Sequence, residues 1–234
     1  MAFKRALVAA APPEADALTA NMVGIGMNFG ATPNPDANIE DTLVYASDDG
    51  MEKTDFRVLA VLITWLGIHA ERVNVDRLAK IVRAKSSPRV RAFWSAVGRW
   101  LRKDRRLARL AAVYRGPRVD LLSTGTDFQG RRHGEDPRFE RTPLRVPANL
   151  LRDRTADVLP PSELARRHAA YRWRVMIGPT YRADMWAAIE RDPQLSATAL
   201  ARRTYGSFAT AWHVRRDFVL LRMTEVQGKA PSGT

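Results

Sequence analysis

The side chains best suited to chemistry in this chain share one face of an expected helix near the carboxyl terminus. Helical spacing after residue 207 turns six of them to the same side: Phe208, Ala209, Trp212, His213, Arg215 and Arg216. Guanidinium groups donate paired hydrogen bonds, an imidazole donates or accepts, and aromatic rings add flat apolar surface. This combination suits the base edges and thymine methyl groups that line the major groove of DNA, and Trp212 is the candidate for a thymine methyl contact.

Two short helices joined by a tight turn must position that face. We expect Leu200 and Ala201 inside the first helix, and Gly206 in the backbone conformation that the turn requires. Serine oxygens at both helix starts can accept from unpaired backbone amides, which makes Ser196 and Ser207 the expected caps. A preceding helix over residues 181–192 completes a three-helix core. Its inward residues, with those of the last helix, are Met185, Trp186, Ile189, Ala211, Val214 and Phe218.

This segment resembles the helix-turn-helix family of DNA-binding repressors. The residues that carry the resemblance are Leu200, Ala201, Gly206, Ser207, Thr210 and Val214. It departs at the turn, where the family has an aliphatic residue at Thr204, glycine at Tyr205 and an aliphatic residue at Gly206, so we expect a turn one residue longer. The resemblance implies base contacts from Ser207, Phe208, Ala209, His213 and Arg216, and phosphate contacts from Thr198, Arg202 and Arg203. The alternative is a helical hairpin whose arginines only solvate its outer face.

Charge is segregated along the chain. The formal net charge is +13, and residues 72–118 hold fifteen bases against two acids, whereas residues 1–56 hold three bases against nine acids. A compact fold with such a basic block is favoured by a polyanionic partner, and nucleic acid is the most common one. We therefore expect phosphate contacts from Arg89, Arg91, Arg99 and Arg115. A codon bias toward arginine explains the preference for arginine over lysine but not the segregation.

The predicted fold is mainly α, with tandem helix-turn-helix or winged-helix modules and a small β element. Residues 1–53 form an acidic arm with a short helix over residues 38–46, and residues 12–37 are expected to be a loose arm or irregular loop. Residues 54–122 form a basic helical domain, residues 123–161 an irregular connector and residues 162–226 the carboxyl-terminal helix-turn-helix domain. The basic domain is similar to a winged helix in pattern, because three helices precede an expected hairpin of residues 111–114 and 118–122. An ordinary helical bundle with a basic surface is the alternative.

Several kinds of catalytic site find no support in the sequence. There is no cysteine, and the four histidines are scattered, so no metal site or cofactor is expected. Acidic and basic residues mix over residues 120–138, which would suit a magnesium-dependent nuclease or, more simply, surface ion pairs. The alternation of Tyr171 and Trp173 with Arg172 and Arg174 would suit stacking on single-stranded bases. The alternative is a helix with one aromatic ring turned inward and its arginines in solvent.

These patterns predict a transcriptional regulator, not an enzyme, that acts as a repressor on double-stranded DNA. No segment reaches the length of a membrane span or forms a secretion signal, so we expect a cytoplasmic protein without a membrane partner. The alternative is an antitoxin-like protein that neutralises a partner protein such as a toxin and represses its own promoter. A third hypothesis is that the acidic segment covers the basic block of its own chain. Palindromic operators would call for a homodimer.

Overall fold

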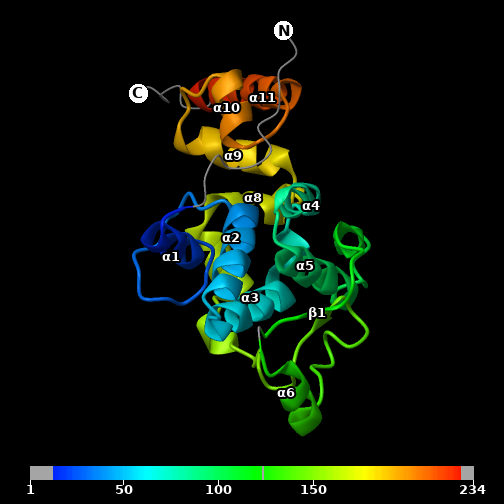
Figure 1. The fold of residues 1–234 in the computed structure, drawn as a ribbon. Coiled ribbons are helices and arrows are strands. Elements are labelled where there is room, and N and C mark those ends of the chain that lie inside the picture. Colours follow the sequence, from blue (N-terminus) through cyan, green and yellow to red (C-terminus); the bar gives the residue numbers. More distant parts are fainter. Residues whose placement is uncertain (1–12, 123, 228–234) are drawn as a thin grey trace. The chain divides into compact units, whose positions relative to one another are not determined.

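The computed structural model describes residues 13–122 and 124–227, and the fold is mainly α as predicted. The chain divides into two compact units, one of which ends at His168 while the other takes the chain from Ala169 onward. Figure 1 colours the helices along the sequence, from α1 in blue to α11 in red. No helix in the described part of the chain combines the length and apolar composition that a bilayer span requires.

The helices of the first unit are α1 (Ala15–Gly24), α2 (Ile39–Glu52), α3 (Phe56–His69), α4 (Val75–Ala84), α5 (Pro88–Trp100), α6 (Thr126–His133) and α7 (Pro161–Arg167). Three short 3-10 helices belong to the same unit: η1 (Ala70–Arg72), η2 (Leu107–Val113) and η3 (Thr155–Asp157). The second unit contains α8 (Ala169–Ile177), α9 (Tyr181–Arg191), α10 (Ala197–Arg203) and α11 (Phe208–Gln227). The prediction of an irregular loop within residues 12–37 is wrong where α1 forms. Alanine and leucine have high helix propensity, and α1 contains Ala15, Ala17, Leu18 and Ala20.

Side-chain caps begin the helices of the first unit where the sequence places them. Asn38 accepts from the Asp41 amide at 3.0 Å, and Asn74 accepts from the Arg77 amide at 3.2 Å. Ser87 accepts from the Val90 amide, with Pro88 in the first turn of α5. The acidic helix α2 is longer than predicted and contacts α3, α4 and α5, because its apolar residues are fully buried. It is therefore a core element of this unit rather than an appendage.

The predicted hairpin of a winged helix is wrong. Residues 111–113 complete the 3-10 helix η2, which packs on α5. The only sheet among the described residues consists of β1 (Val119–Asp120) and β2 (Leu144–Arg145), which pair in parallel. Leu110 and Val113 are buried, and the apolar residues of η2 gain more from facing α5 than from pairing as an exposed edge strand.

A buried histidine closes α3. The His69 side chain is 1% exposed, its ring lies 4.8 Å from that of Trp65, and its Nε2 donates to the Leu159 carbonyl at 3.0 Å. Burial disfavours the charged imidazolium and lowers the pKa of His69 from 6.5 to about 4. Protonation of His69 therefore destabilises the folded state.

This pKa predicts an acid-sensitive fold. The unfolded state binds the proton below pH 6.5 and the folded state only near pH 4, so the stabilisation is complete above pH 6.5 and is lost as the pH falls toward 4. The free energy of unfolding should fall by up to about 3 kcal/mol across that window because of His69 alone. Urea unfolding at pH 7, 6 and 5 measures the slope, and the variant His69→Gln should be less dependent on pH than the wild type. Equal slopes for the two proteins would contradict this role.

In the second unit, α9, α10 and α11 pack around one core, and Figure 1 shows them as a group from yellow to red. The core contains Met185, Trp186, Ile189, Leu200, Ala201, Ala211 and Val214, with Phe218 packed at its edge. All of these are the inward residues that the helical spacing predicts. Ser196 and Ser207 cap α10 and α11, accepting from the Ala199 and Thr210 amides at 3.1 Å each.

The turn between α10 and α11 differs from the prediction in one respect. Tyr205, not Gly206, takes the left-handed conformation, with φ of 58°. The Tyr205 amide donates to the Arg202 carbonyl and the Gly206 amide to the Ala201 carbonyl, which is the pairing of a Schellman helix end. Tyr205 thus adopts the left-handed conformation at the position where the helix-turn-helix pattern has a glycine. The turn closes without the additional residue that the sequence led us to expect.

A side chain at Gly206 would require the end of the Met185 side chain to move. A Cβ atom built there would lie 2.1 Å from Cε of Met185, which is fully buried in the core. The close approach of this backbone to Met185 brings the start of α11 against α9. The sequence pattern therefore locates the turn correctly, but it assigns the left-handed conformation to Gly206 instead of Tyr205.

Candidate functional site

The outward face of α11 is the candidate binding surface. Phe208 is 45% exposed and Trp212 is 48% exposed, and Ala209, His213 and Arg216 are also exposed. These residues lie on the side of the helix opposite Ala211 and Val214, which are fully buried in the core. Ser207 differs from the other residues predicted to contact bases, because it is half-buried and its hydroxyl accepts from the Thr210 amide as the helix cap.

Arg216 has contacts on both sides within this face. Its guanidinium lies 5.5 Å above the ring of Trp212, and its Nη2 is 3.0 Å from Oδ1 of Asp217. Arg182 of α9 also binds Asp217, at 3.0 Å. Hydrogen bonds from Arg216 and then from Arg182 hold the pKa of Asp217 below its ordinary value. The Arg216 side chain remains 52% exposed, and an ion pair this exposed is weak enough to be exchanged for a ligand.

The indole of Trp212 meets the imidazole of His213 edge to face, with ring centroids 5.1 Å apart. Together with Arg216 they form a continuous aromatic and cationic strip, since the Arg216 guanidinium covers the same indole. Arg215 does not belong to this strip, because its guanidinium donates to the Leu195 carbonyl. A strip of this composition can stack on planar groups and donate hydrogen bonds to acceptors.

The predicted phosphate contacts of α10 lie near the start and end of that helix. Arg202 and Arg203 are exposed in its last turn, and Thr198 is half-buried in its first turn. All three belong to the same three-helix unit as the α11 face. Arg202 and Arg203 are therefore exposed cations of the unit that carries the α11 face.

The predicted phosphate contacts of the basic block have different surroundings. Arg115 is exposed and Arg99 is exposed with one backbone contact, to the Arg141 carbonyl at 3.4 Å. Arg89 instead donates to the Leu121 carbonyl, which commits its guanidinium to the unit's own backbone. Arg91 is half-buried, and its Nε atom is buried with no hydrogen-bond partner in the described structure. The structure thus leaves Arg99 and Arg115 as the accessible members.

The acidic helix α2 neutralises part of the basic block. Arg77 is 1% exposed and forms a 2.5 Å ion pair with Asp41. Lys85 pairs with Asp48 at 2.7 Å, and its Nζ lies 4.2 Å above the ring of Tyr45. These pairs lie within one unit and fix α4 against α2, so the cations that can meet an external anion are fewer than the sequence count implies.

The carboxylates between residues 120 and 138 do not gather into a metal site. Asp120 pairs with Arg145 at 2.6 Å, Glu135 with Arg118 at 2.6 Å and Asp136 with Arg138 at 2.5 Å. Within residues 13–122 and 124–227 there is no group of three histidine or carboxylate side chains that could hold a metal ion. Asp120, Glu135 and Asp136 are instead engaged in ion pairs, and Asp136 is the buried member of this set.

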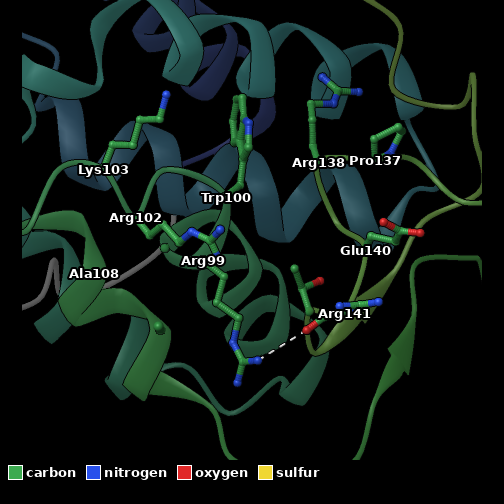
Figure 2. A pocket seen from close by; sticks show the side chains of 12 residues that line it. Arg99, Trp100, Arg102, Lys103, Ala108, Pro137, Arg138, Glu140 and Arg141 are labelled. Atoms are coloured by element: carbon green, nitrogen blue, oxygen red, sulfur yellow. Dashed lines mark hydrogen bonds between the residues drawn. The ribbon is translucent and has the colours of Figure 1, made fainter.

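A second basic cluster was not predicted. Figure 2 shows Arg99, Arg102 and Lys103, near the end of α5, on the opposite side of the view from a loop that carries Arg138 and Arg141, and Arg99 points toward Arg141. They line a pocket of about 680 Å³. The charge pattern along the sequence does not reveal this cluster. The loop lies in residues 123–161, where acidic and basic residues are nearly equal in number, but its basic residues line the pocket.

No family model, curated protein or solved structure matches this chain.

Proposed function

We propose that this protein binds double-stranded DNA and regulates transcription, with α11 as the helix that reads bases. The observation that most supports this proposal is the exposed strip of Phe208, Trp212, His213 and Arg216 on a helix whose opposite side packs into the core. A helix held this way can enter a major groove without loss of its own packing. The rigid turn at Tyr205 and Gly206 supports it, because a base-reading helix needs a fixed orientation.

Phosphate contacts come from a different set of residues in this proposal. Arg202 and Arg203 at the end of α10, with Arg99 and Arg115 of the basic block, are exposed cations. They contribute affinity without sequence information, because phosphates are the same at every base pair. The proposed role is that of a repressor that covers its operator, without catalysis, and no wing is part of it.

Two single substitutions separate these roles. Arg216→Ala should weaken binding to the preferred site by about 1–3 kcal/mol and leave binding to random DNA nearly unchanged. Arg202→Ala should weaken binding to both DNAs equally and reduce the salt slope by about one. Fluorescence anisotropy with both duplexes measures the effects.

Arg166→Ala is the matched control, because Arg166 is an exposed arginine of α7 outside the proposed surface. Removal of this charge should leave both affinities within the error of the measurement. The assignment of base reading to α11 fails if Arg216→Ala and Arg166→Ala behave alike.

One observation favours a second function, binding of a protein partner in the manner of an antitoxin. Val219 is 44% exposed, and its spacing places it on the same side of α11 as Phe208 and Trp212. Three large exposed apolar residues on one helix face are more typical of a protein interface than of a DNA contact. Trp212→Asp separates the two functions: loss of DNA binding supports base reading, whereas unchanged DNA affinity supports the partner surface.

A further inference from the structure

We propose that the pocket between the end of α5 and the loop before β2 binds a small nucleotide with two or more phosphate groups. The site is independent of α11 and does not rest on the proposed DNA binding. Its volume of about 680 Å³ lies in the range of small-molecule sites. A cavity of this size can enclose a nucleotide.

Charge gives the first argument. The pocket is lined by five bases and one acid, namely Arg99, Arg102, Lys103, Arg138, Arg141 and Glu140. Asp136 balances the charge of Arg138, so the excess positive charge comes from Arg99, Arg102, Lys103 and Arg141. Among the described residues, no ion pair joins Arg102, Lys103 or Arg141 to a carboxylate, although ion pairs are abundant elsewhere in the unit. Like charges that line one cavity repel one another, and a multiply charged anion reduces that repulsion. Guanidinium groups bind phosphate oxygens in pairs, which suits a di- or triphosphate.

Preorganisation gives the second argument. Arg138 is held by Asp136, with Nε to Oδ1 at 2.9 Å, and it also donates to the Leu151 carbonyl. Arg141 has φ of 56°, a left-handed conformation that is costly for a residue with a side chain and persists only where the surroundings impose it. Its carbonyl accepts from Arg99 across the pocket, as the dashed line in Figure 2 shows. The side chains of Arg99 and Arg138 and the backbone at Arg141 are thus held before a ligand arrives, which reduces the entropy lost on binding.

The wall of the pocket gives the third argument, for a planar base. Trp100 lines the pocket and is half-buried, with its ring 6.4 Å from that of Phe139. The Arg138 guanidinium lies 5.9 Å from the Trp100 ring centroid. An indole beside a cationic cluster offers one surface for a base and another for phosphates. An inorganic polyphosphate would contact the cations of this pocket but would leave the Trp100 ring without a partner from the ligand.

The test is isothermal titration of the full chain with ATP and with inorganic tripolyphosphate. ATP should bind with a saturable one-to-one isotherm and more tightly than tripolyphosphate. Ala108→Glu adds a carboxylate to the pocket without removing a contact, and Ala112→Glu adds the same charge on the same 3-10 helix outside the lining. Ala108→Glu should weaken ATP binding by about tenfold or more, and Ala112→Glu should have little effect.

A second pair of variants tests the cations themselves. The double variant Arg102→Gln/Lys103→Gln should lose ATP binding, while Arg131→Gln/Arg132→Gln on α6, where both arginines are exposed, should keep it. Equal ATP affinity in all variants, or no ATP binding by the wild type, would overturn the site. Equal affinity for ATP and tripolyphosphate would overturn the nucleotide assignment. Loss of duplex DNA binding in Ala108→Glu, without any binding of ATP to the wild type, would assign the cluster to DNA phosphates and also overturn it.

Discussion

Raising the salt concentration from 50 to 200 mM is expected to weaken DNA binding by the full chain about a thousandfold or more, if six to ten phosphates are neutralised. Each neutralised phosphate releases a counterion, and that release is less favourable in concentrated salt. The accessible cations that we assign to this term include Arg99, Arg115 and Arg202, all of which are exposed. Anisotropy titrations at four or more salt concentrations give the slope directly.

The variant Arg115→Gln/Arg202→Gln provides the internal check. Both side chains are exposed and neither has an ion pair within the described structure, so their loss should not disturb folding. The slope should become shallower by about two for two lost phosphate contacts, or by about one if only one of them meets DNA. A binding constant that barely changes with salt would contradict the phosphate role of the basic block.

Removal of one partner from the buried ion pair of Arg174 and Asp184 is expected to destabilise the second unit by about 3–5 kcal/mol. The two side chains are 1% and 7% exposed, and they form two parallel hydrogen bonds of 2.8 and 2.9 Å. Asp184→Asn or Arg174→Met leaves a charge buried without its counterpart. Because the pair joins α8 to α9, the loss falls on the helix that supports α11.

The double variant Arg174→Met/Asp184→Leu should recover much of that stability, because no charge is left in the interior. Urea unfolding followed by tryptophan fluorescence measures all three proteins, since Trp173 and Trp186 stack in the same unit with centroids 5.2 Å apart. A single variant within about 1 kcal/mol of the wild type would show that the pair is not desolvated as described.

Helical periodicity and capping residues were sufficient to predict the three-helix core of the second unit. Leu200, Ala201 and Val214 are buried because helical spacing places them on the apolar faces of α10 and α11 that pack against the core. The same periodicity does not reveal which polar residues are paired. Arg174 was expected to stay in solvent, but it is buried because Asp184, ten positions later, returns to meet it. Pairing of this kind depends on tertiary contacts.

The basic block shows the same limit in a different form. The sequence gives the sign and the density of charge, and Arg115 is exposed as expected. It does not show that α2 is a core helix whose Asp41 and Asp48 take up Arg77 and Lys85. The predicted hairpin failed because short apolar stretches do not distinguish a strand from a 3-10 helix packed on α5. The cationic pocket needs two segments some forty positions apart, which no local pattern joins.

Selection of bound fragments from a pool of random duplex DNA tests the central proposal most directly. The full chain is predicted to enrich a short sequence motif, and Arg216→Ala is predicted to relax that motif at one or more positions while it still retains DNA. The fold of the variant is checked by its unfolding curve. A pool that stays random after repeated selection with the wild-type chain, or a motif that Arg216→Ala and His213→Ala leave unchanged, would contradict base reading by α11.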